Sequence, residues 1–298
     1  MKLALFENFH AAFYIPFYVL KALRFADKEG LEIDWLPPGP PGAGIEAVQN
    51  GTVDLTWGGP MRVMKDRDTH AETDRSLVCF SQVVTRDPFC LVGRAPAPFK
   101  LEDLARLRMS LVSEVPTPWL CLQADLADRG LDVHQLQAQG RLVTDLTMQQ
   151  QIEALASGKT DVIQLFEPFV SQIEAAGQGS LLYAASSRGV TLYTTFIASK
   201  AGAAKNAAAF AALDRAVGAM QQWLFAATPD EIAGVVEGLF PGVARPILIS
   251  VIQRYRSTGV WSLQREVSVE AFDRLANCLL RGGFIRSPGS FMDCVVTL

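Results

Sequence analysis

Three polar or aromatic side chains follow the first apolar run of the chain, residues 2–6. They are Asn8, His10 and Tyr14. Such groups hold a small aromatic solute by ring stacking and one or two hydrogen bonds. The phenylalanines of the same segment, Phe9, Phe13 and Phe17, are expected to pack in the core instead. The three side chains are the first candidate site, because ligands of open α/β sheets bind beyond the carboxyl ends of the strands.

A second group of candidates ends the apolar run 53–57, in the motif TWGGP. Trp57 stands where the run ends, and Gly58 and Gly59 would let a ligand approach the backbone closely. Gly59 is also expected to open a helix, whose first N–H groups favour an anion or another acceptor. The alternative is that Trp57 is a buried packing residue.

A third group lies in the motif SEVPTPWL, residues 113–120, between a predicted strand and a predicted helix. Ser113 and Glu114 are candidate ligand contacts. Thr117 and Trp119 lie at the start of the helix and are candidates as well. Thr117 is expected to cap that helix whatever else it does.

Glu167 is an isolated carboxylate after the apolar run 161–166. A buried acid needs a donor partner, so a ligand that it touches should carry N–H donors or positive charge. Such contact would argue against nitrate or a sulfonate. The alternatives are a salt bridge or an acid at a helix N-terminus. Tyr193 and Thr194 could close the same site, or belong to an ordinary strand.

Other chemistries find no support. The three histidines lack the spacing of metal ligands, the acidic loop around His70 does not fit the calcium-loop pattern, and no GxSxG, P-loop or GxGxxG motif occurs. The five cysteines are widely spaced, without a CxxC pair. We therefore expect no metal and no cofactor. A net charge of −4 without a long basic run argues against nucleic-acid binding.

The elements that would carry these groups alternate between strand and helix. Strands are predicted at 2–6, 31–36, 53–57, 77–84, 89–93, 108–112 and 161–166, and helices at 16–30, 45–50, 118–129, 148–157, 206–227, 228–239, about 244–257 and about 268–281. Residues 37–44, PPGPPGAG, are predicted to form a loop. Thr228 and Glu231 have the spacing of a capping box. The alternation predicts the α/β class, with parallel sheets, helical crossovers and a helical C-terminal tail.

An internal repeat indicates two similar lobes. EAVQNGTVD (46–54) and EALASGKTD (153–161) share Glu, Ala, Gly and Asp at a distance of 107 residues, and GLEID (30–34) has a weaker echo in GLDVH (130–134). We expect one lobe from 1–88 and 195–298, a second from 89–194, and a ligand cleft between them. Hinges are expected near 87–88 and 190–195. The alternative is that junctions of helix, glycine and strand look alike in unrelated proteins.

Location is left open by the sequence. No apolar stretch approaches the ~20 residues of a membrane span. Glu7, Asn8 and His10 interrupt the apolar N-terminal segment, which is therefore a poor signal peptide. The chain either stays in the cytoplasm or loses an upstream leader and works in the periplasm or as a lipid-anchored protein outside the cytoplasmic membrane.

Four segments together resemble a known family: FYIPFYVLKALRFADKEGLEIDWLPPG, AVQNGTVDLTWGGP, LEDLARLRMSLVSEVPTPWLCLQADLADRGLD and ALASGKTDVIQLFEPF. The chain is similar over residues 1–225 to ABC-transporter substrate-binding proteins of the type II periplasmic-binding fold. The nearest branch holds thiamine-pyrimidine precursors, nitrate, sulfonates and taurine. The resemblance implies a two-lobed fold of mixed, mostly parallel sheets, with the loop 113–120 as a ligand clamp and Glu167 as the acid that reads an amino-heterocycle.

Two enzymes of that branch fit less well. The fungal thiamine-pyrimidine synthase has a cysteine cluster in its second half, whereas residues 187–199 here contain no cysteine. The bacterial aryl-sulfinate desulfinase uses a cysteine after the first strand, and none occurs there. We therefore expect a monomeric solute-binding protein without chemistry. It would close on a small aromatic or heteroaromatic metabolite for an ABC permease. The alternatives are an enzyme on the same scaffold and a cytoplasmic ligand sensor.

Overall fold

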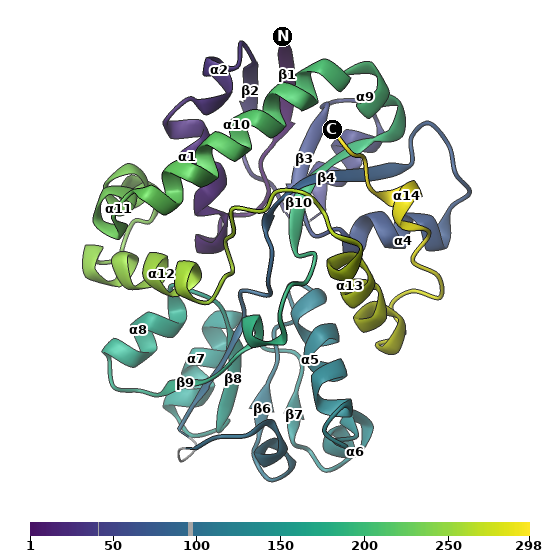
Figure 1. Cartoon of the computed structure of the whole chain (residues 1–298). Coiled ribbons are helices and arrows are strands. Elements are labelled where there is room, and N and C mark those ends of the chain that lie inside the picture. The colour runs from purple at the N-terminus through teal and green to yellow at the C-terminus, as the bar shows by residue number, and fades with distance from the viewer. Residues whose placement is uncertain (41, 95–97) are drawn as a thin grey trace. The chain divides into compact units, whose positions relative to one another are not determined.

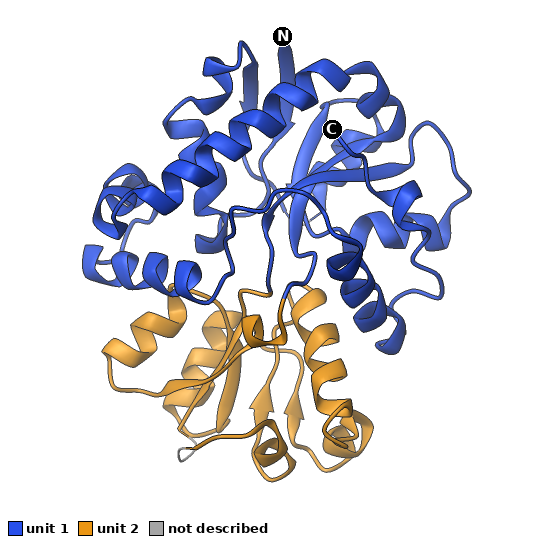
Figure 2. Cartoon of the chain, in the orientation of Figure 1, with its two compact units in different colours: residues 1–86, 190–298 blue, residues 87–189 orange. Residues whose placement is uncertain are grey.

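The computed structural model describes residues 1–40, 42–94 and 98–298, which form two compact units (Figure 2). Unit 1 comprises Met1–Arg86 and Val190–Leu298, and unit 2 comprises Asp87–Gly189. Residues 190–194, which the sequence-based boundary assigned to the second lobe, belong to unit 1. The helical C-terminal part of the chain is also in unit 1.

Unit 1 is built on a five-stranded sheet in the order β2-β1-β3-β10-β4. Strands β2, β1 and β3 are parallel, and β10 is antiparallel to both of its neighbours. The bounds are β1 Lys2–Phe6, β2 Glu32–Leu36, β3 Leu55–Gly58, β4 Leu77–Val84 and β10 Thr194–Ser199. The sheet is therefore mixed and mostly parallel, as the sequence predicts.

Ten α-helices of the described residues belong to unit 1 (Figure 1). They are α1 Ile15–Ala22, α2 Phe25–Lys28, α3 Ala43–Gln49, α4 Met61–Thr69, α9 Lys200–Lys205, α10 Ala207–Ala226, α11 Pro229–Val236, α12 Arg245–Ser257, α13 Val269–Arg281 and α14 Phe291–Cys294. Helix α1 packs with α2, α10 and α11, whereas α4 packs with β4, α13 and α14. The capping box predicted at Thr228 and Glu231 is present at the start of α11.

Unit 2 repeats the sheet order as β7-β6-β8-β5-β9. Strands β7, β6 and β8 are parallel, and β5 is antiparallel to β8 and β9. The bounds are β5 Cys90–Gly93, β6 Met109–Ser110, β7 Leu142–Val143, β8 Val162–Leu165 and β9 Ser180–Ala184. In each unit the reversed strand, β10 or β5, is the one that the chain enters from the other unit.

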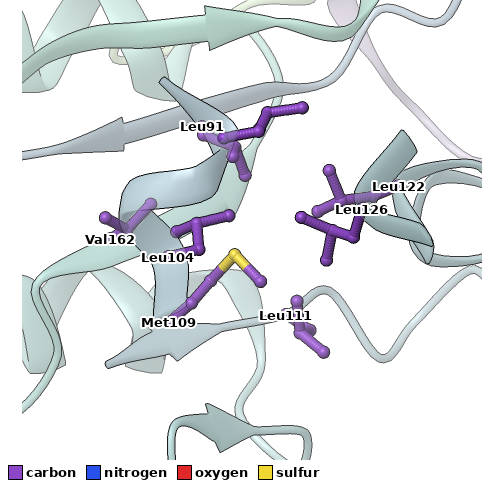
Figure 3. Close-up of a cluster of buried hydrophobic side chains, with 8 residues drawn as sticks. Leu91, Leu104, Met109, Leu111, Leu122, Leu126 and Val162 are labelled. Carbon is purple, nitrogen blue, oxygen red and sulfur yellow. The ribbon is translucent and has the colours of Figure 1, made fainter. Parts of the chain in front are cut away.

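Four α-helices of the described residues belong to unit 2: α5 Thr117–Ala127, α6 Val133–Ala138, α7 Met148–Ala156 and α8 Phe169–Ala175. Figure 3 shows Leu122 and Leu126 of α5 beside Leu91 of β5 and Met109 of β6 in a buried apolar cluster. Each of these side chains is at most 1% exposed. Burial of such a side chain contributes about 1.5–3 kcal/mol, so this cluster fixes α5 and the loop before it against the sheet.

The two chain crossings are joined at their unit 2 ends by a buried ion cluster. Arg188 Nη1 lies 3.0 Å from Asp87 Oδ2, and its Nη2 lies 2.6 Å from Asp125 Oδ2. Tyr183 donates its hydroxyl to the same Asp125 oxygen at 2.8 Å. Burial raises the pKa of Asp87 despite the neighbouring guanidinium. In unit 1, the Thr191 N–H donates to the Thr85 carbonyl at 2.7 Å, so the crossings run side by side.

The stronger sequence repeat is a structural repeat. Gly51 and Gly158 end α3 and α7 with φ of 77° and 73°, a conformation that favours glycine. The residue after each glycine donates its N–H to the matching helix carbonyl, Thr52 to Ala47 and Lys159 to Ala154. Each junction then leads into the third strand of its sheet, β3 or β8.

Some local predictions are wrong. The weaker sequence similarity, between GLEID and GLDVH, is not a structural repeat beyond the glycine. GLEID leads into strand β2, whereas Asp132 of GLDVH caps helix α6. The helix predicted from 16 to 30 is broken by Arg24, which has a φ of 54° and separates α1 from α2. Strand β3 begins at Leu55 rather than at residue 53, and α3 begins at Ala43, inside the predicted loop.

Candidate functional site

The side chains that follow β1 and β3 in unit 1 form one connected group. Asn8 Nδ2 donates to the Trp57 carbonyl at 2.9 Å and lies 3.4 Å from the Tyr14 hydroxyl. The Tyr14 and Trp57 rings meet edge to face, with centroids 6.0 Å apart. The structure therefore brings together three of the residues that the sequence nominates, at the carboxyl end of adjacent parallel strands.

Trp57 is both a packing residue and an incompletely bonded one. Its ring is 1% exposed and stacks on Phe17 at 4.5 Å, which matches the packing alternative. Its Nε1–H, however, has no hydrogen-bond partner among the described residues. A buried N–H without an acceptor costs about 1–3 kcal/mol, so this donor is suited to an acceptor that the chain itself does not supply.

Thr194 and Tyr193 belong to the same side of unit 1 as this group. Thr194 is the first residue of β10, is fully buried, and lies close enough to Tyr14 to influence the pKa of its hydroxyl. Its own Oγ1 makes no hydrogen bond of good geometry within the described chain. The Tyr193 ring packs edge to face on Phe13 at 6.2 Å. Burial raises the pKa of Tyr14 above its ordinary value, so Tyr14 is protonated near neutral pH.

His10 makes its ring contacts away from this group. Its ring stacks on Tyr18 at 5.2 Å and lies 4.6 Å from the Phe240 ring. Partial burial lowers the pKa of His10, although Glu7 acts in the opposite direction. His10 is therefore a mainly neutral, stacking side chain, and its role in binding stays a prediction.

The two glycines after Trp57 serve the protein's own packing. A Cβ at Gly58 would lie 3.0 Å from Asn8 Nδ2, so the missing side chain lets the Asn8 amide approach β3. The Gly59 carbonyl accepts the N–H of Arg62 at 3.1 Å. The helix α4 begins at Met61 with Pro60 as its N-cap, not at Gly59 as predicted, because the chain first completes the turn 59–62.

In unit 2, the loop before α5 is tied down through its predicted ligand residues. Ser113 Oγ donates to the Leu146 carbonyl at 3.2 Å, and Glu114 Oε1 accepts the Met148 N–H at 3.1 Å. Thr117 is the first residue of α5, with Pro116 as the N-cap and no side-chain capping bond, so the predicted Thr117 cap is wrong. Trp119 is partly buried against the apolar cluster of unit 2.

Glu167 has the alternative role that the sequence left open. It is fully buried, and its two carboxylate oxygens accept the Ser171 N–H at 2.9 Å and the Ser171 hydroxyl at 2.8 Å. These bonds satisfy donors in the first turn of α8. Donation from a ligand is therefore not required to explain this buried acid, and ligand contact by Glu167 stays a prediction.

Gln164 is a functional candidate that the sequence reading missed. It lies in β8, and its Oε1 accepts the Val112 N–H at 3.4 Å while its Nε2 donates to the Pro118 carbonyl at 3.1 Å. One amide thus holds both ends of the loop 113–117. A buried glutamine in an otherwise apolar strand, VIQL, is the sequence signal that could have identified it.

Arg62 is the second residue that was missed. It occupies the first turn of α4, and its guanidinium lies 3.3 Å from the position of a Cβ at Gly42. The signal was a cation at the start of a helix, where the macrodipole disfavours positive charge. Such a placement calls for a compensating anion or a function.

The described residues contain neither a metal-ligating cluster nor a membrane-spanning helix. No three His, Cys, Asp or Glu side chains of residues 1–40, 42–94 and 98–298 are grouped to hold a metal ion. Across the same residues, no helix has the length and apolarity to cross a membrane.

Comparisons with known proteins agree with this architecture. YtlA of Bacillus subtilis (strain 168), named as a binding protein, is 22% identical over 95% of this chain and 84% of its own length. The Escherichia coli periplasmic aliphatic sulphonate-binding protein SsuA has a TM-score of 0.78 at 16% identity, over 99% of this chain and 92% of that chain. The Synechocystis PCC 6803 periplasmic nitrate-binding protein NrtA has a TM-score of 0.67 at 14% identity, over 98% and 83%.

These solved structures identify the fold as that of the periplasmic binding proteins, as the sequence predicts. The model of the family described as NMT1/THI5 like matches residues 12–232, which is most of the chain. The chain therefore belongs to the NMT1/THI5-like family.

Proposed function

We propose that this protein is a solute-binding protein that captures a small aromatic or heteroaromatic metabolite for an ABC importer. The observation that carries the proposal is the unpartnered, buried Nε1–H of Trp57 beside Tyr14 and Asn8, at the carboxyl end of β1 and β3. An aromatic wall with a free donor suits a flat solute that has a hydrogen-bond acceptor. The relatives named above as binding proteins support the same class.

A thiamine-pyrimidine precursor is the finer form of this proposal. It rested on Glu167 as an acceptor for the amino group of a pyrimidine. Because Ser171 already donates to both oxygens of Glu167, that support is weakened. The aromatic character of the solute rests on Tyr14 and Trp57 instead, and a pyrimidine becomes one arm of the test below.

Capture would follow from the division into two units. Unit 1 supplies the aromatic group, and unit 2 supplies the loop 113–117 that Gln164 holds at both ends. We propose that closure about the crossings at 86–87 and 189–190 brings the two sets of residues onto one solute. The presumed partner is an ABC permease, with the protein acting outside the cytoplasmic membrane as a monomer.

Catalytic turnover would need a reactive cysteine or lysine, and the candidate side chains are buried or paired. Cys121, the cysteine nearest to the predicted ligand loop, is fully buried in α5. Lys21 is paired with Glu7, and Lys65 donates to the Phe284 carbonyl at 2.8 Å. Burial raises the pKa of Cys79 to about 12, so that group is a thiol rather than a nucleophilic thiolate.

The test is native mass spectrometry of freshly purified protein, before and after mild denaturation. We expect a small molecule to be released on unfolding, and its mass to match an aromatic or heteroaromatic compound. If none is released, a thermal-shift screen of pyrimidines, aromatic acids and sulfonates follows. Absence of both a released mass and any shift would overturn the proposal.

A pair of tryptophan variants tests the location of the site. The substitution Trp57→Phe keeps an aromatic ring but removes Nε1–H, and should weaken solute binding about fivefold to tenfold, the worth of one neutral hydrogen bond. The matched control is Trp223→Phe in α10, outside the group. Equal affinities for both variants would place the solute elsewhere.

A further inference from the structure

The loop 113–117 of unit 2 is held by two buried side-chain amides, the first of which lies on helix α7. Gln151 of α7 is fully buried, and its Oε1 accepts the Ser110 hydroxyl of β6 and the Gln164 N–H of β8, both at 3.1 Å. The amide of Gln164 in turn bonds the residues on either side of the loop. Helix α7, strands β6 and β8 and the loop are therefore connected through Gln151 and Gln164.

The orientation of the Gln151 amide follows from the Gln164 backbone. A backbone N–H can only donate, so the oxygen of the Gln151 side chain must face it. The Nε2 group of Gln151 then has no hydrogen-bond partner within the described chain. Burying a donor without an acceptor is costly. Because a helix does not require glutamine at this position, we attribute the residue to the two bonds that its oxygen makes.

The equivalent position of unit 1 carries no side chain. Gly44 of α3 precedes Gln151 by 107 residues, which is the spacing of the internal repeat. A Cβ at Gly44 would lie 2.4 Å from Thr56 Oγ1, so α3 approaches β3 closely through the glycine. In unit 2, the side chain of Gln151 bridges α7 and two strands instead. The packing of helix on strand does not itself need an amide, so the amide is a feature of the unit that carries the loop.

Helix α7 also bonds the loop directly. Glu114 Oε1 accepts the N–H of Met148, the first residue of α7, and Ser113 Oγ donates to the carbonyl of Leu146, just before the α7 N-cap. The loop is therefore fixed within its own length as well as at its ends. Fixing a backbone costs conformational entropy, and a loop that is already fixed does not lose this entropy again when it binds.

We infer that Gln151 is a positioning residue for solute binding, which acts through Gln164 to hold the loop 113–117 in its binding conformation before a solute arrives. This rests on the proposed solute-binding function and deepens it, because it assigns part of the affinity to a side chain of α7 that acts through another residue. The loop is then as well ordered without a solute as with one.

Hydrogen exchange of the full chain, measured without solute, tests the positioning. The substitution Q151M keeps an unbranched side chain of similar length but removes the acceptor. We expect the N–H groups of Gln164 and Val112 to exchange faster than in the wild type. The matched control Q149M makes the same change at an exposed glutamine of the same helix and should leave both rates unchanged. Q151E keeps an acceptor oxygen and should restore most of the protection.

Calorimetry tests the effect on binding. The probes are 4-aminopyrimidine, benzoate and benzenesulfonate, one for each class of the thermal-shift screen. We expect Q151M to lose about tenfold in affinity for a probe that the wild type binds, because its loop must be ordered on binding. Q164M removes both bonds to the loop and should lose at least as much, and it carries the test if Q151M does not fold. The control I173V trims a buried side chain of α8, and should lower the unfolding temperature without changing affinity.

The outcomes separate this inference from the proposed function. Unchanged exchange of the loop in Q151M would overturn the inference, and so would an affinity loss that I173V shares. Faster exchange with unchanged affinity would refute the positioning role while solute binding stands. If only a co-purified molecule binds, its occupancy in each purified variant replaces the calorimetric affinity. If no probe binds and no molecule is released on unfolding, the proposed function fails, and the exchange data then assign Gln151 a structural role alone.

Discussion

The two units make the same junction with the same aspartate and then diverge within three residues. Asp54 donates its N–H to the Ala4 carbonyl and accepts the Ala4 N–H at 2.8 Å. Asp161 does the same with Arg108, also at 2.8 Å. Each aspartate thus joins β3 or β8 to its parallel neighbour, β1 or β6. The shared part of the repeat thus has a structural task that needs no ligand.

The divergence follows on the next strand residues. Trp57 of β3 and Gln164 of β8 occupy equivalent positions of the repeat, 107 residues apart. Gln164 is bonded at both ends of its amide, whereas Trp57 keeps an unpartnered Nε1–H. Unit 2 therefore uses this position to preorganise its own loop. Unit 1 keeps one donor, the Trp57 Nε1–H, available at the same position, which is why we place the proposed solute there.

The largest effect is expected at the buried ion cluster of unit 2. The substitution Arg188→Met leaves Asp87 and Asp125 buried without their cation. Breaking such a buried cluster costs about 3–5 kcal/mol. Hydrogen exchange measured by mass spectrometry should show lost protection across 87–189 and little change in unit 1.

The control is Arg245→Met, because Arg245 also pairs with two acids, Asp230 and Glu237, but on the surface. That loss should be far smaller, because solvent screens an exposed ion pair. If the two variants lost the same stability, the buried cluster would contribute no more than the surface pairs of Arg245, and this prediction would be wrong.

A smaller effect is expected from the shared aspartates. Asp54→Ala and Asp161→Ala each leave one strand N–H without its acceptor, at a cost of about 1–3 kcal/mol. Asp54→Ala also loses the bond from Asn206 Nδ2, and Asp161→Ala loses the ion pair with Arg108. Each should lower exchange protection in the first strand of its own unit only. Asp54→Asn and Asp161→Asn keep a side-chain carbonyl oxygen and should be milder. Strongly unequal losses for the two alanine variants would show that the junctions are not equivalent.

The glycines of the repeat should give a still smaller effect. Gly51→Ala and Gly158→Ala meet no atom within 4 Å, so only the positive φ is penalised, by about 1 kcal/mol each. Gly238→Ala has the same open surroundings without a positive φ and should change stability by less than about 0.5 kcal/mol. Denaturant unfolding measures all three. A harmless change at Gly51 or Gly158 would contradict the strain argument.

The smallest effect is expected from the pH dependence of stability. Burial raises the pKa of Asp161, but hydrogen bonds and charge from Arg108 outweigh it and lower the pKa overall. The carboxylate therefore adds stability above its unfolded pKa, about 3.9, and this is lost as pH falls through the lower folded value. The difference in stability between wild type and Asp161→Asn should shrink below about pH 4. A constant difference would exclude this linkage.

The sequence predicted those features of the fold that rest on local pattern. The repeat, the α10 helix and the capping box at Thr228 depend on neighbouring residues, and the structure confirms them. The break at Arg24 and the short strands β6 and β7 were not predicted as they stand, because they are set by packing between distant segments. Pattern carries no information on such contacts.

The sequence could nominate residues that the structure groups together, but it could not give their bonding partners. The carboxyl ends of β1 and β3 identified Asn8, Tyr14 and Trp57, which the structure brings together. The roles of Glu167 and Arg62 could not be read, because each depends on its partners: Ser171 satisfies the acid, and no described acid satisfies the arginine. Whether a charge is paired is a property of the folded chain, not of the sequence around it.

The position of β10 has a consequence for the order of events during synthesis. Strand β4 has β10 as its sheet neighbour, so it waits for residues 194–199 before it can join the sheet of unit 1. Unit 2, in contrast, has all of its strands once residue 184 has been made. As the chain emerges from the ribosome, the middle of the protein is therefore expected to fold before its beginning. Residues 1–86 therefore cannot complete the sheet of unit 1 until β10, more than a hundred residues later, has been translated.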